Sequence, residues 1–251
     1  MAERARVKPA RPASPAPRKR RLRRWLLWLA LAPMIFSFLW VLLYRWVDPP
    51  LSGVMAERII EARRAGNSVF RIDQQWCTLD SVGPYLPVAI VAAEDQRFLE
   101  HSGFDTVEIE KALAAREDGA RLRGASTLSQ QVAKNVFLWS GRSYLRKGLE
   151  AWFTVLIELL WNKERILEVY LNVAETGDGL FGFCRACEVR FGKDCERLSP
   201  YQLALLVATL PNPRQRRADK PTAYLHQRAS WIVKQSEQLG GPAWLQRMRG
   251  E

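Results

Sequence analysis

Two carboxylates stand inside dense polar strings in the middle of this 251-residue chain. Glu94 opens the first string, which reads Glu-Asp-Gln-Arg-Phe-Leu-Glu-His-Ser-Gly-Phe-Asp over residues 94–105. Glu150 closes the second string, which begins at Gly124. Carboxylates and cations gathered in this way are costly to place in a hydrophobic core, so they indicate a site. The residue types predict general acid–base chemistry on an acidic substrate.

Glu94 is the candidate base of the first string. It follows the apolar run 88–93, and a carboxylate bordered by apolar side chains has a raised pKa, which suits a general base near neutral pH. The alternative is a helix-terminal acid that pairs with Arg97. His101 also has two interpretations, a hydrogen-bonded structural histidine or a catalytic one, and we favour the structural one.

The second string supplies hydroxyls, amides and cations. These are Ser126, Thr127, Gln130, Gln131, Lys134, Asn135, Arg146 and Lys147. With Ser126 as the N-cap of a helix through Lys134, the start of that helix adds backbone donors for an anion. The alternative is a solvated helix face, which would usually carry Glu and Lys instead of two glutamines. Arg146 is four residues from Glu150, a spacing that fits a simple ion pair or an ionised Glu150 beside a bound diphosphate.

These groups are the parts that glycosyl transfer from a sugar diphosphate requires. A base takes the proton of an acceptor hydroxyl, and cations neutralise the leaving diphosphate. The two strings together offer two carboxylates, at least three cations and several amide donors.

Helices are the elements that must position these groups. An apolar run introduced by Pro84 and Pro87 leads to Glu94, and Ser199-Pro200 opens a helix that stops before Pro211. Helical spacing of apolar residues predicts further helices over residues 107–117, 126–134, 145–160, 166–171 and 222–239. Gly119 and Gly124 bracket a polar loop. The chain shows no repeat and no convincing β-sheet pattern, so the predicted fold class is mainly α.

The net charge of +12 is concentrated in an N-terminal tail. Residues 1–24 carry ten Lys/Arg and one acid, and this Pro-, Ala- and Arg-rich segment is expected to be disordered. The remainder has a net charge of only +3. A nucleic-acid-binding protein would carry the excess on its folded body, so nucleic acid is disfavoured as a partner.

A membrane anchor is expected over residues 25–47. Trp25 to Tyr44 contains no charged residue, and a spanning helix needs roughly 20 apolar residues. The basic cluster before it predicts a cytoplasmic N-terminus, which places residues 48–251 on the outer side as one domain. The alternative, a cleaved signal peptide, would usually have a shorter apolar core and a small-residue cleavage site.

Four cysteines are present: Cys77, Cys184, Cys187 and Cys195. An extracytoplasmic domain permits disulfides. The Cys184-x-x-Cys187 spacing could belong to a redox or metal pair, but the missing second pair and the lack of a nearby histidine disfavour zinc. A bridge such as Cys187–Cys195, or free thiols, is favoured. The sequence shows no metal site made by the protein, and it leaves open whether Mg²⁺ or Mn²⁺ assists.

The polar strings resemble those of the peptidoglycan glycosyltransferase family, which is found in class A penicillin-binding proteins and in monofunctional transglycosylases. The resemblance covers roughly residues 50–235, with the motif core over about 70–235. Its motifs are Glu94-Asp95-x-x-Phe98-x-x-His101-x-Gly103-x-Asp105, Gly124-x-Ser126-Thr127-x-x-Gln130-Gln131-x-x-Lys134-Asn135, Arg146-Lys147-x-x-Glu150 and Lys163-x-x-Ile166-Leu167-Glu168-x-Tyr170-Leu171-Asn172. Ala125 and Ser129 depart from the family pattern by small changes. The Ser-x-x-Lys and Lys-Thr-Gly strings of a penicillin-binding domain do not occur, so the chain resembles the monofunctional form.

The resemblance implies a lysozyme-like α domain with an apolar patch that dips into the bilayer. Glu94 would deprotonate the GlcNAc 4-hydroxyl of lipid II, and Glu150, with Lys134, Arg146 and Lys147, would hold the donor diphosphate and its sugar. The growing glycan would leave undecaprenyl diphosphate with inversion and form a β-1,4 link. Asp95, Phe98 and His101 would join the donors of the second string in binding substrate.

The expected location is the cell inner membrane, with a single span, a cytoplasmic N-terminus and a periplasmic catalytic domain. The partners implied are lipid II, the carrier-linked glycan and the bilayer, and cell-division or penicillin-binding proteins are left open as partners. A lytic muramidase is the first rival function, although cleaving a neutral glycosidic bond requires no group of cations for a diphosphate. A non-enzymatic scaffold is the second.

Overall fold

The computed structural model describes residues 17–117, 126–141 and 143–250. The chain divides into two compact units, residues 1–40 and 41–251. The first unit holds most of helix α1 (Pro17–Leu43), which contains Pro33. Within the described residues, no helix is both long enough and apolar enough to cross a membrane. The structure therefore does not confirm the anchor expected over residues 25–47.

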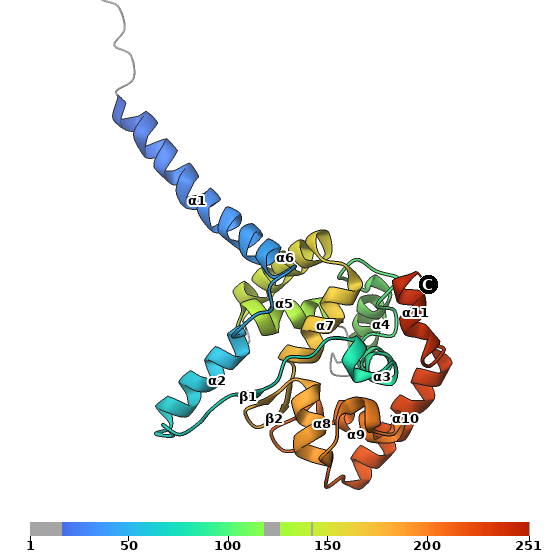
Figure 1. Ribbon diagram of the computed structural model, residues 1–251. Helices are drawn as coiled ribbons and strands as arrows, with labels where there is room; N and C mark the ends of the chain where they lie inside the picture. Colours follow the sequence, from blue (N-terminus) through green and yellow to red (C-terminus); the bar gives the residue numbers. More distant parts are fainter. Residues whose placement is uncertain (1–16, 118–125, 142, 251) are drawn as a thin grey trace, which may run out of the picture. The chain divides into compact units, whose positions relative to one another are not determined.

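The second unit is mainly helical, as the sequence predicts (Figure 1). Its described α-helices are α2 (Gly53–Arg64), α3 (Tyr85–Glu94), α4 (Thr106–Glu117), α5 (Leu128–Phe137), α6 (Tyr144–Leu160), α7 (Lys163–Val173), α8 (Phe183–Phe191), α9 (Pro200–Thr209), α10 (Ala223–Gln238) and α11 (Ala243–Arg249). Short 3-10 helices η1 (Asp80–Val82) and η2 (Cys195–Arg197) complete the helical elements of the described residues.

Helix α3 forms the centre of the core. Every residue from Leu86 to Ala92 is buried, as expected for a helix that is apolar on all sides. It packs against α9 and α10, while α5 packs against α6 and α7. Figure 1 shows the α5–α7 group and the α8–α10 group at opposite ends of this unit. The last residue of α3 is Glu94, so the packing of this buried helix fixes the position of the candidate base.

Most helix boundaries predicted from the sequence are confirmed. Helices α4, α6, α9 and α10 begin and end within a few residues of the expected positions, and Ser199 caps α9. The N-cap of α5 is Thr127 rather than Ser126, because the Thr127 hydroxyl accepts the backbone N–H of Gln130. The loop expected around Gly119 and Gly124 lies outside the described residues.

A small sheet was not predicted. Among the described residues, β1 (Asp73–Gln74), β2 (Glu175–Gly177) and β3 (Leu180–Phe181) form a sheet in the order β1-β3-β2. β1 pairs with β3 in parallel, and β2 pairs with β3 antiparallel. Strands of two or three residues are too short to show the alternating pattern by which a strand is recognised in a sequence.

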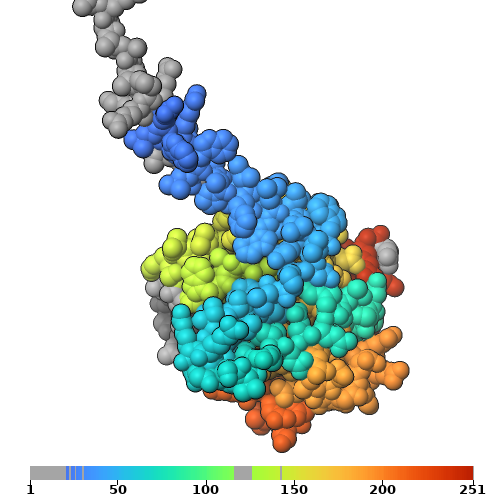
Figure 2. Space-filling model, turned by 60° about the vertical axis from the view of Figure 1, so that its left-hand side comes forward, coloured from blue at the N-terminus to red at the C-terminus, as the bar shows by residue number. Residues whose placement is uncertain are grey.

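Helix α2 is joined to this sheet by charge. The buried Arg58 guanidinium contacts Glu61 on its own helix, Glu175 of β2 at 3.1 Å, and Asp178. α2 also packs against α5, and the space-filling view shows the region of α2 at the surface beside the α5–α6 region (Figure 2). The ion pairs and the packing fix α2 between the sheet and the helices that carry the second polar string.

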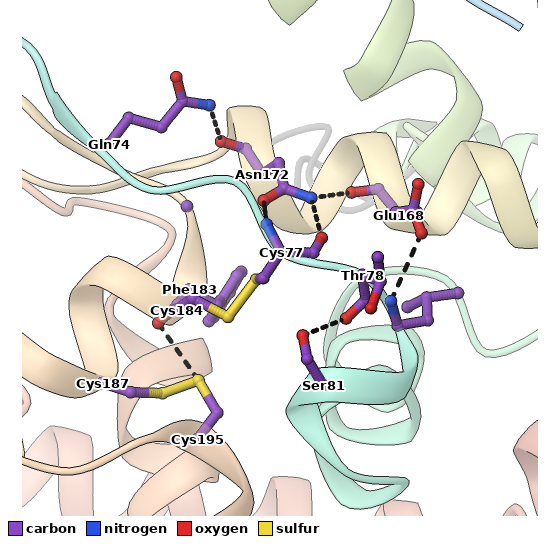
Figure 3. Close-up of a disulfide and its surroundings, with 12 residues drawn as sticks. Gln74, Cys77, Thr78, Ser81, Glu168, Asn172, Phe183, Cys184, Cys187 and Cys195 are labelled. Atoms are coloured by element: carbon purple, nitrogen blue, oxygen red, sulfur yellow. Dashed lines mark hydrogen bonds between the residues drawn. A yellow bond between two sulfur atoms is a disulfide. The ribbon is translucent and has the colours of Figure 1, made fainter. Parts of the chain in front are cut away.

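Two disulfides cross-link the second unit within the described residues. Cys187 pairs with Cys195, as one of the sequence-based alternatives has it, and Cys77 pairs with Cys184, which was not predicted. Free thiols are thereby excluded, and so is a metal or redox role for Cys184-x-x-Cys187 as a pair. Figure 3 shows the Cys77 backbone held by Asn172 of α7, whose amide oxygen accepts the Cys77 N–H and whose amide nitrogen donates to the Cys77 carbonyl.

Candidate functional site

Glu94 lies at the wall of a cavity rather than in the core proper. It is partly buried and lines a cavity of about 740 Å³, which we call the larger cavity. Burial raises the pKa of Glu94, whereas a hydrogen bond from Gln131 and the charges of Arg228 and Lys134 lower it in part. A carboxylate with a raised pKa and access to a cavity can accept a proton from a bound hydroxyl.

A hydrogen-bond relay orients Glu94. The Gln131 Nε2 donates to Glu94 Oε2 at 3.0 Å, and the Tyr170 hydroxyl donates to Gln131 Oε1 at 3.2 Å. Burial and the charge of Glu94 raise the pKa of Tyr170 well above its usual value, so this hydroxyl remains a donor. The amide nitrogen of Gln131 therefore faces Glu94, and the carboxylate is held toward the cavity.

Lys134 is within electrostatic range of both candidate carboxylates. Burial lowers its pKa, while Glu150 and Glu94 act in the opposite sense and Arg146 and Lys147 reinforce the lowering. It lines the larger cavity together with Ser126, Gln131 and Asn135. An ammonium at the cavity wall, within electrostatic range of both carboxylates, is placed to approach a bound anion.

Glu150 is buried and acts as the counter-ion of two cations. Arg146 Nη1 lies 2.5 Å from Glu150 Oε2, and Lys147 Nζ pairs with the other oxygen. The buried Arg146 Nε has no hydrogen-bond partner among the described residues. Glu150, Arg146 and Lys147 are not among the described residues that line the larger cavity. The charges of these three residues act on Lys134, which does line the cavity. The Nε–H of Arg146 remains an unused hydrogen-bond donor among the described residues.

Several predicted substrate-binding residues form the scaffold around Glu94. Asp95 Oδ1 pairs with His101 Nε2 at 2.9 Å, and Asp95 Oδ2 accepts the Leu128 N–H at the start of α5. His101 Nδ1 accepts the Gly103 N–H, so both ring nitrogens of His101 have protein partners. This hub joins the end of α3 to the beginning of α5.

Phe98, Thr127 and Gln130 also have structural partners. Phe98 is fully buried beneath the Lys163 ammonium, whose Nζ is 4.5 Å from the ring centroid. Thr127 donates to the Gly103 carbonyl, and the Gln130 side chain accepts the Thr127 N–H. Direct substrate contact, as expected for these three residues, stays a prediction.

The donor atoms of Asp95, His101 and Asp105 lie within 4.8 Å of one another, a grouping that could by residue type hold a metal ion. Both Asp95 oxygens and both His101 nitrogens already have protein partners. Asp105 Oδ1 accepts from Arg97 and from the Glu108 N–H. We therefore interpret the cluster as a hydrogen-bonded hub, which has no need of a cation.

Two functional candidates were not singled out from the sequence. Tyr170 was quoted only as a motif residue, and its part in the relay depends on a contact with Gln131, 39 positions away. Arg228 of α10 lines the larger cavity, and its Nη2 donates to the Ala93 carbonyl beside Glu94. Only the packing of α10 on α3 brings this cation to the site.

Comparisons with known proteins show which family the chain is similar to. Residues 63–237 match the family model described as Transglycosylase. A protein of Xanthomonas campestris pv. campestris (strain B100), named biosynthetic peptidoglycan transglycosylase, is 54% identical over 218 residues, which cover 86% of this chain and 89% of the relative. Proteins of the same name from Xanthomonas axonopodis pv. citri (strain 306) and Stutzerimonas stutzeri (strain A1501) are 55% and 54% identical. The first covers 87% of this chain and 90% of the relative, and the second 85% and 88%.

Proposed function

The chain belongs to the transglycosylase family and is a peptidoglycan glycosyltransferase, and we propose that it polymerises lipid II with Glu94 as the general base. The observation that carries this proposal is the placement of Glu94 at a cavity wall, within the electrostatic range of Lys134. A lysozyme-like arrangement of the helices, as the resemblance implies, is part of the same proposal.

The chemical step exchanges one bond at the donor sugar for another. Glu94 takes the proton of the acceptor 4-hydroxyl, and the acceptor oxygen forms a bond to the donor anomeric carbon. The bond from that carbon to the phosphate oxygen breaks, and its electron pair leaves with undecaprenyl diphosphate. Attack opposite the leaving group inverts the anomeric centre and gives a β-1,4 link.

Lys134 is the group proposed to neutralise the leaving diphosphate. Its ammonium lines the cavity that contains Glu94, and the Glu150 carboxylate counters the lowering of the Lys134 pKa by burial. Arg146 adds an unpartnered buried Nε. Preorganised cations of this kind stabilise charge that develops in the transition state, which a muramidase acting on a neutral glycan would not need.

The proposed location is the periplasmic face of the inner membrane, with residues 25–47 as the anchor. The disulfides support the oxidising side of that membrane. An apolar face of α6 supports contact with lipid, since Leu145 and Leu159 are 72% and 70% exposed and Tyr144 and Val155 are exposed as well. Lipid contact there would let the carrier chain of the substrate stay in the bilayer.

Polymerisation of labelled lipid II by the detergent-solubilised chain tests the proposal. Glu94→Gln should lower turnover by about 10²–10⁴-fold, the usual contribution of general base catalysis, and should retain lipid II binding. Glu196→Gln, an exposed carboxylate on η2, is the matched control and should remain active.

Three outcomes would overturn the proposal. Full activity of Glu94→Gln would remove Glu94 as the base. Release of short products from preformed peptidoglycan, without polymer, would favour the lytic class. Absence of both activities in the wild-type chain would favour the non-enzymatic scaffold.

A further inference from the structure

A groove between α2 and β1 is separate from the site around Glu94. Its lining includes four apolar residues and two arginines, and we call it the α2 groove: Leu51, Met55, Ile59, Ile72, Arg63 and Arg71. Glu94 lines the larger cavity and a smaller one of about 320 Å³, and the α2 groove shares no described residue with either. Figure 1 shows that the chain turns back after α2 and returns as β1. The proposed reaction gives this groove no task.

The charge of the α2 groove is positive and unbalanced. Arg63 and Arg71 are exposed, and none of the described lining residues is acidic. The acidic neighbours Glu61 and Asp73 already pair with other arginines. The Arg71 Nη1 donates to two backbone carbonyls of the preceding turn, at 3.1 and 3.0 Å, which fixes its guanidinium at one end of the groove. Cations held in this way without a counter-ion are complementary to the carboxylates of a partner.

β1 has an unpaired edge beside the groove. Among the described residues, β1 ends the sheet and pairs only with β3. The Asp73 N–H donates to the Gly179 carbonyl at 2.9 Å. Because consecutive residues of a strand direct their backbone groups to alternate edges, the N–H and C=O of Ile72 point away from β3. Neither group has a hydrogen-bond partner within the described part of the chain, so this edge can pair with an added strand.

The groove also has an apolar floor of the right length for a short peptide. Ile72 packs against the buried Met55 and Phe181, which keeps the floor in place, and Leu51 is 45% exposed. The 12 residues of α2 span about 18 Å at the rise of an α-helix. An extended peptide covers that distance with about five or six residues. Such a peptide would reach from Leu51 to the arginines.

We propose that the α2 groove binds an extended segment of a partner protein by adding it to the sheet beside β1. The backbone of the segment pairs with Ile72, alternate apolar side chains pack on the floor, and carboxylates at one end face Arg63 and Arg71. A second copy of this chain would bring arginines against arginines, and the N-terminal tail is itself basic. A lipid has no backbone to pair with β1. The inference goes beyond the proposed function and does not depend on it.

A display library of short random peptides, panned on the detergent-solubilised chain, tests the proposal. Peptides that alternate apolar and polar residues and end in Asp or Glu should be enriched. Arg63→Glu combined with Arg71→Glu should reverse the preference to Lys or Arg, a gain that an unfolded variant could not show. The enriched acidic peptide should bind this variant at least about tenfold more weakly than the wild type, as the loss of one charge-assisted hydrogen bond predicts.

Arg64→Glu is the matched control, because Arg64 is an exposed arginine of α2 outside the described lining of the groove. It should retain the affinity for the acidic peptide within about twofold, since it makes no charge-assisted contact with it. A second measurement uses only the wild-type chain. Methylating alternate backbone nitrogens of the peptide should abolish binding in one register and spare it in the other, because a strand paired along one edge donates from every second residue.

Four outcomes would overturn the proposal. The first is no enrichment, or enrichment without acidic residues. The second is an unchanged preference in the charge-reversed variant, or equal effects of methylation in both registers. The third is binding of a short-chain phosphatidylglycerol, instead of peptide, with the same dependence on both arginines, which would assign the groove to a lipid. The fourth is self-association of the wild type that charge reversal abolishes, which would assign the groove to a second copy.

Discussion

The disulfides should stabilise the fold unequally, and the difference follows from where they lie in the chain. Cys77 and Cys184 are 107 residues apart, whereas Cys187 and Cys195 are separated by 8. In the chain-entropy model, a cross-link stabilises by restricting the unfolded chain, and the effect grows with the logarithm of the loop length. The model gives about 5 kcal/mol for the long loop and about 2.5 kcal/mol for the short one.

The perturbation is a pair of double variants, Cys77→Ser with Cys184→Ser and Cys187→Ser with Cys195→Ser, which leave no lone thiol behind. For a domain of this size, each kcal/mol lowers the midpoint of thermal unfolding by about 2–4 °C. The long-loop variant should therefore unfold about 10–20 °C below the wild type, and the short-loop variant about 5–10 °C below it. Differential scanning calorimetry of the purified chain in detergent measures both shifts.

The two loops do not overlap along the chain, so the effects should add in a quadruple variant. A long-loop variant that unfolds at the same temperature as the short-loop variant, or above it, would refute the reasoning. The wild type under reducing conditions is the control, and it should reproduce the quadruple variant.

Three further predictions concern the site, the sheet and the apolar face. Gln131→Ala removes the hydrogen bond that lowers the pKa of Glu94, so the acidic limb of the pH–kcat profile should move to higher pH; a limb that stays or moves down would contradict this. Arg58→Met leaves Glu175 of β2 and Asp178 of the following turn without their cation. It should lower the free energy of unfolding, measured by urea titration, by roughly 3 kcal/mol, and an unchanged urea midpoint would contradict this. Leu145→Glu combined with Leu159→Glu should slow the polymerisation of lipid II embedded in phospholipid vesicles, because two exposed apolar side chains of α6 become charged, while activity in detergent should be retained; an unchanged rate in vesicles would remove α6 as the lipid contact.

The local sequence pattern sufficed to predict most helices, because α3 and α6 have strong apolar content and α9 begins with the cap Ser199-Pro200. It also placed Glu94 at the end of the apolar helix, where the structure has it. Helices α2, α8 and α11 were not predicted. α2 is held largely by Arg58 and its distant carboxylates, and such contacts leave no periodic signal in the sequence.

The parts of the site that could not be predicted are those made by long-range contacts. The sequence offered Gln131 as a substrate ligand, but its hydrogen bond to Glu94 spans 37 residues. The sequence likewise offered Asp95 and His101 as substrate ligands, which stays a prediction, but it did not show that they pair with each other or that Asp95 also binds the start of α5. The residue types predicted which segments contribute polar groups to the site. Which of these groups already have hydrogen-bond partners within the protein depends on the packing of the helices.

The Cys77–Cys184 bridge has a consequence for the order in which the protein matures. Every residue from Glu94 to Glu150 lies inside the loop that this bridge closes. Because a chain is synthesised from its N-terminus, Cys77 emerges with no native partner until 107 more residues have followed, whereas Cys187 meets Cys195 almost at once. Both candidate carboxylates are thus synthesised before the loop that holds them can be covalently closed, and Arg228 follows only afterwards. Cys77 is the thiol that an oxidant or disulfide isomerase encounters first.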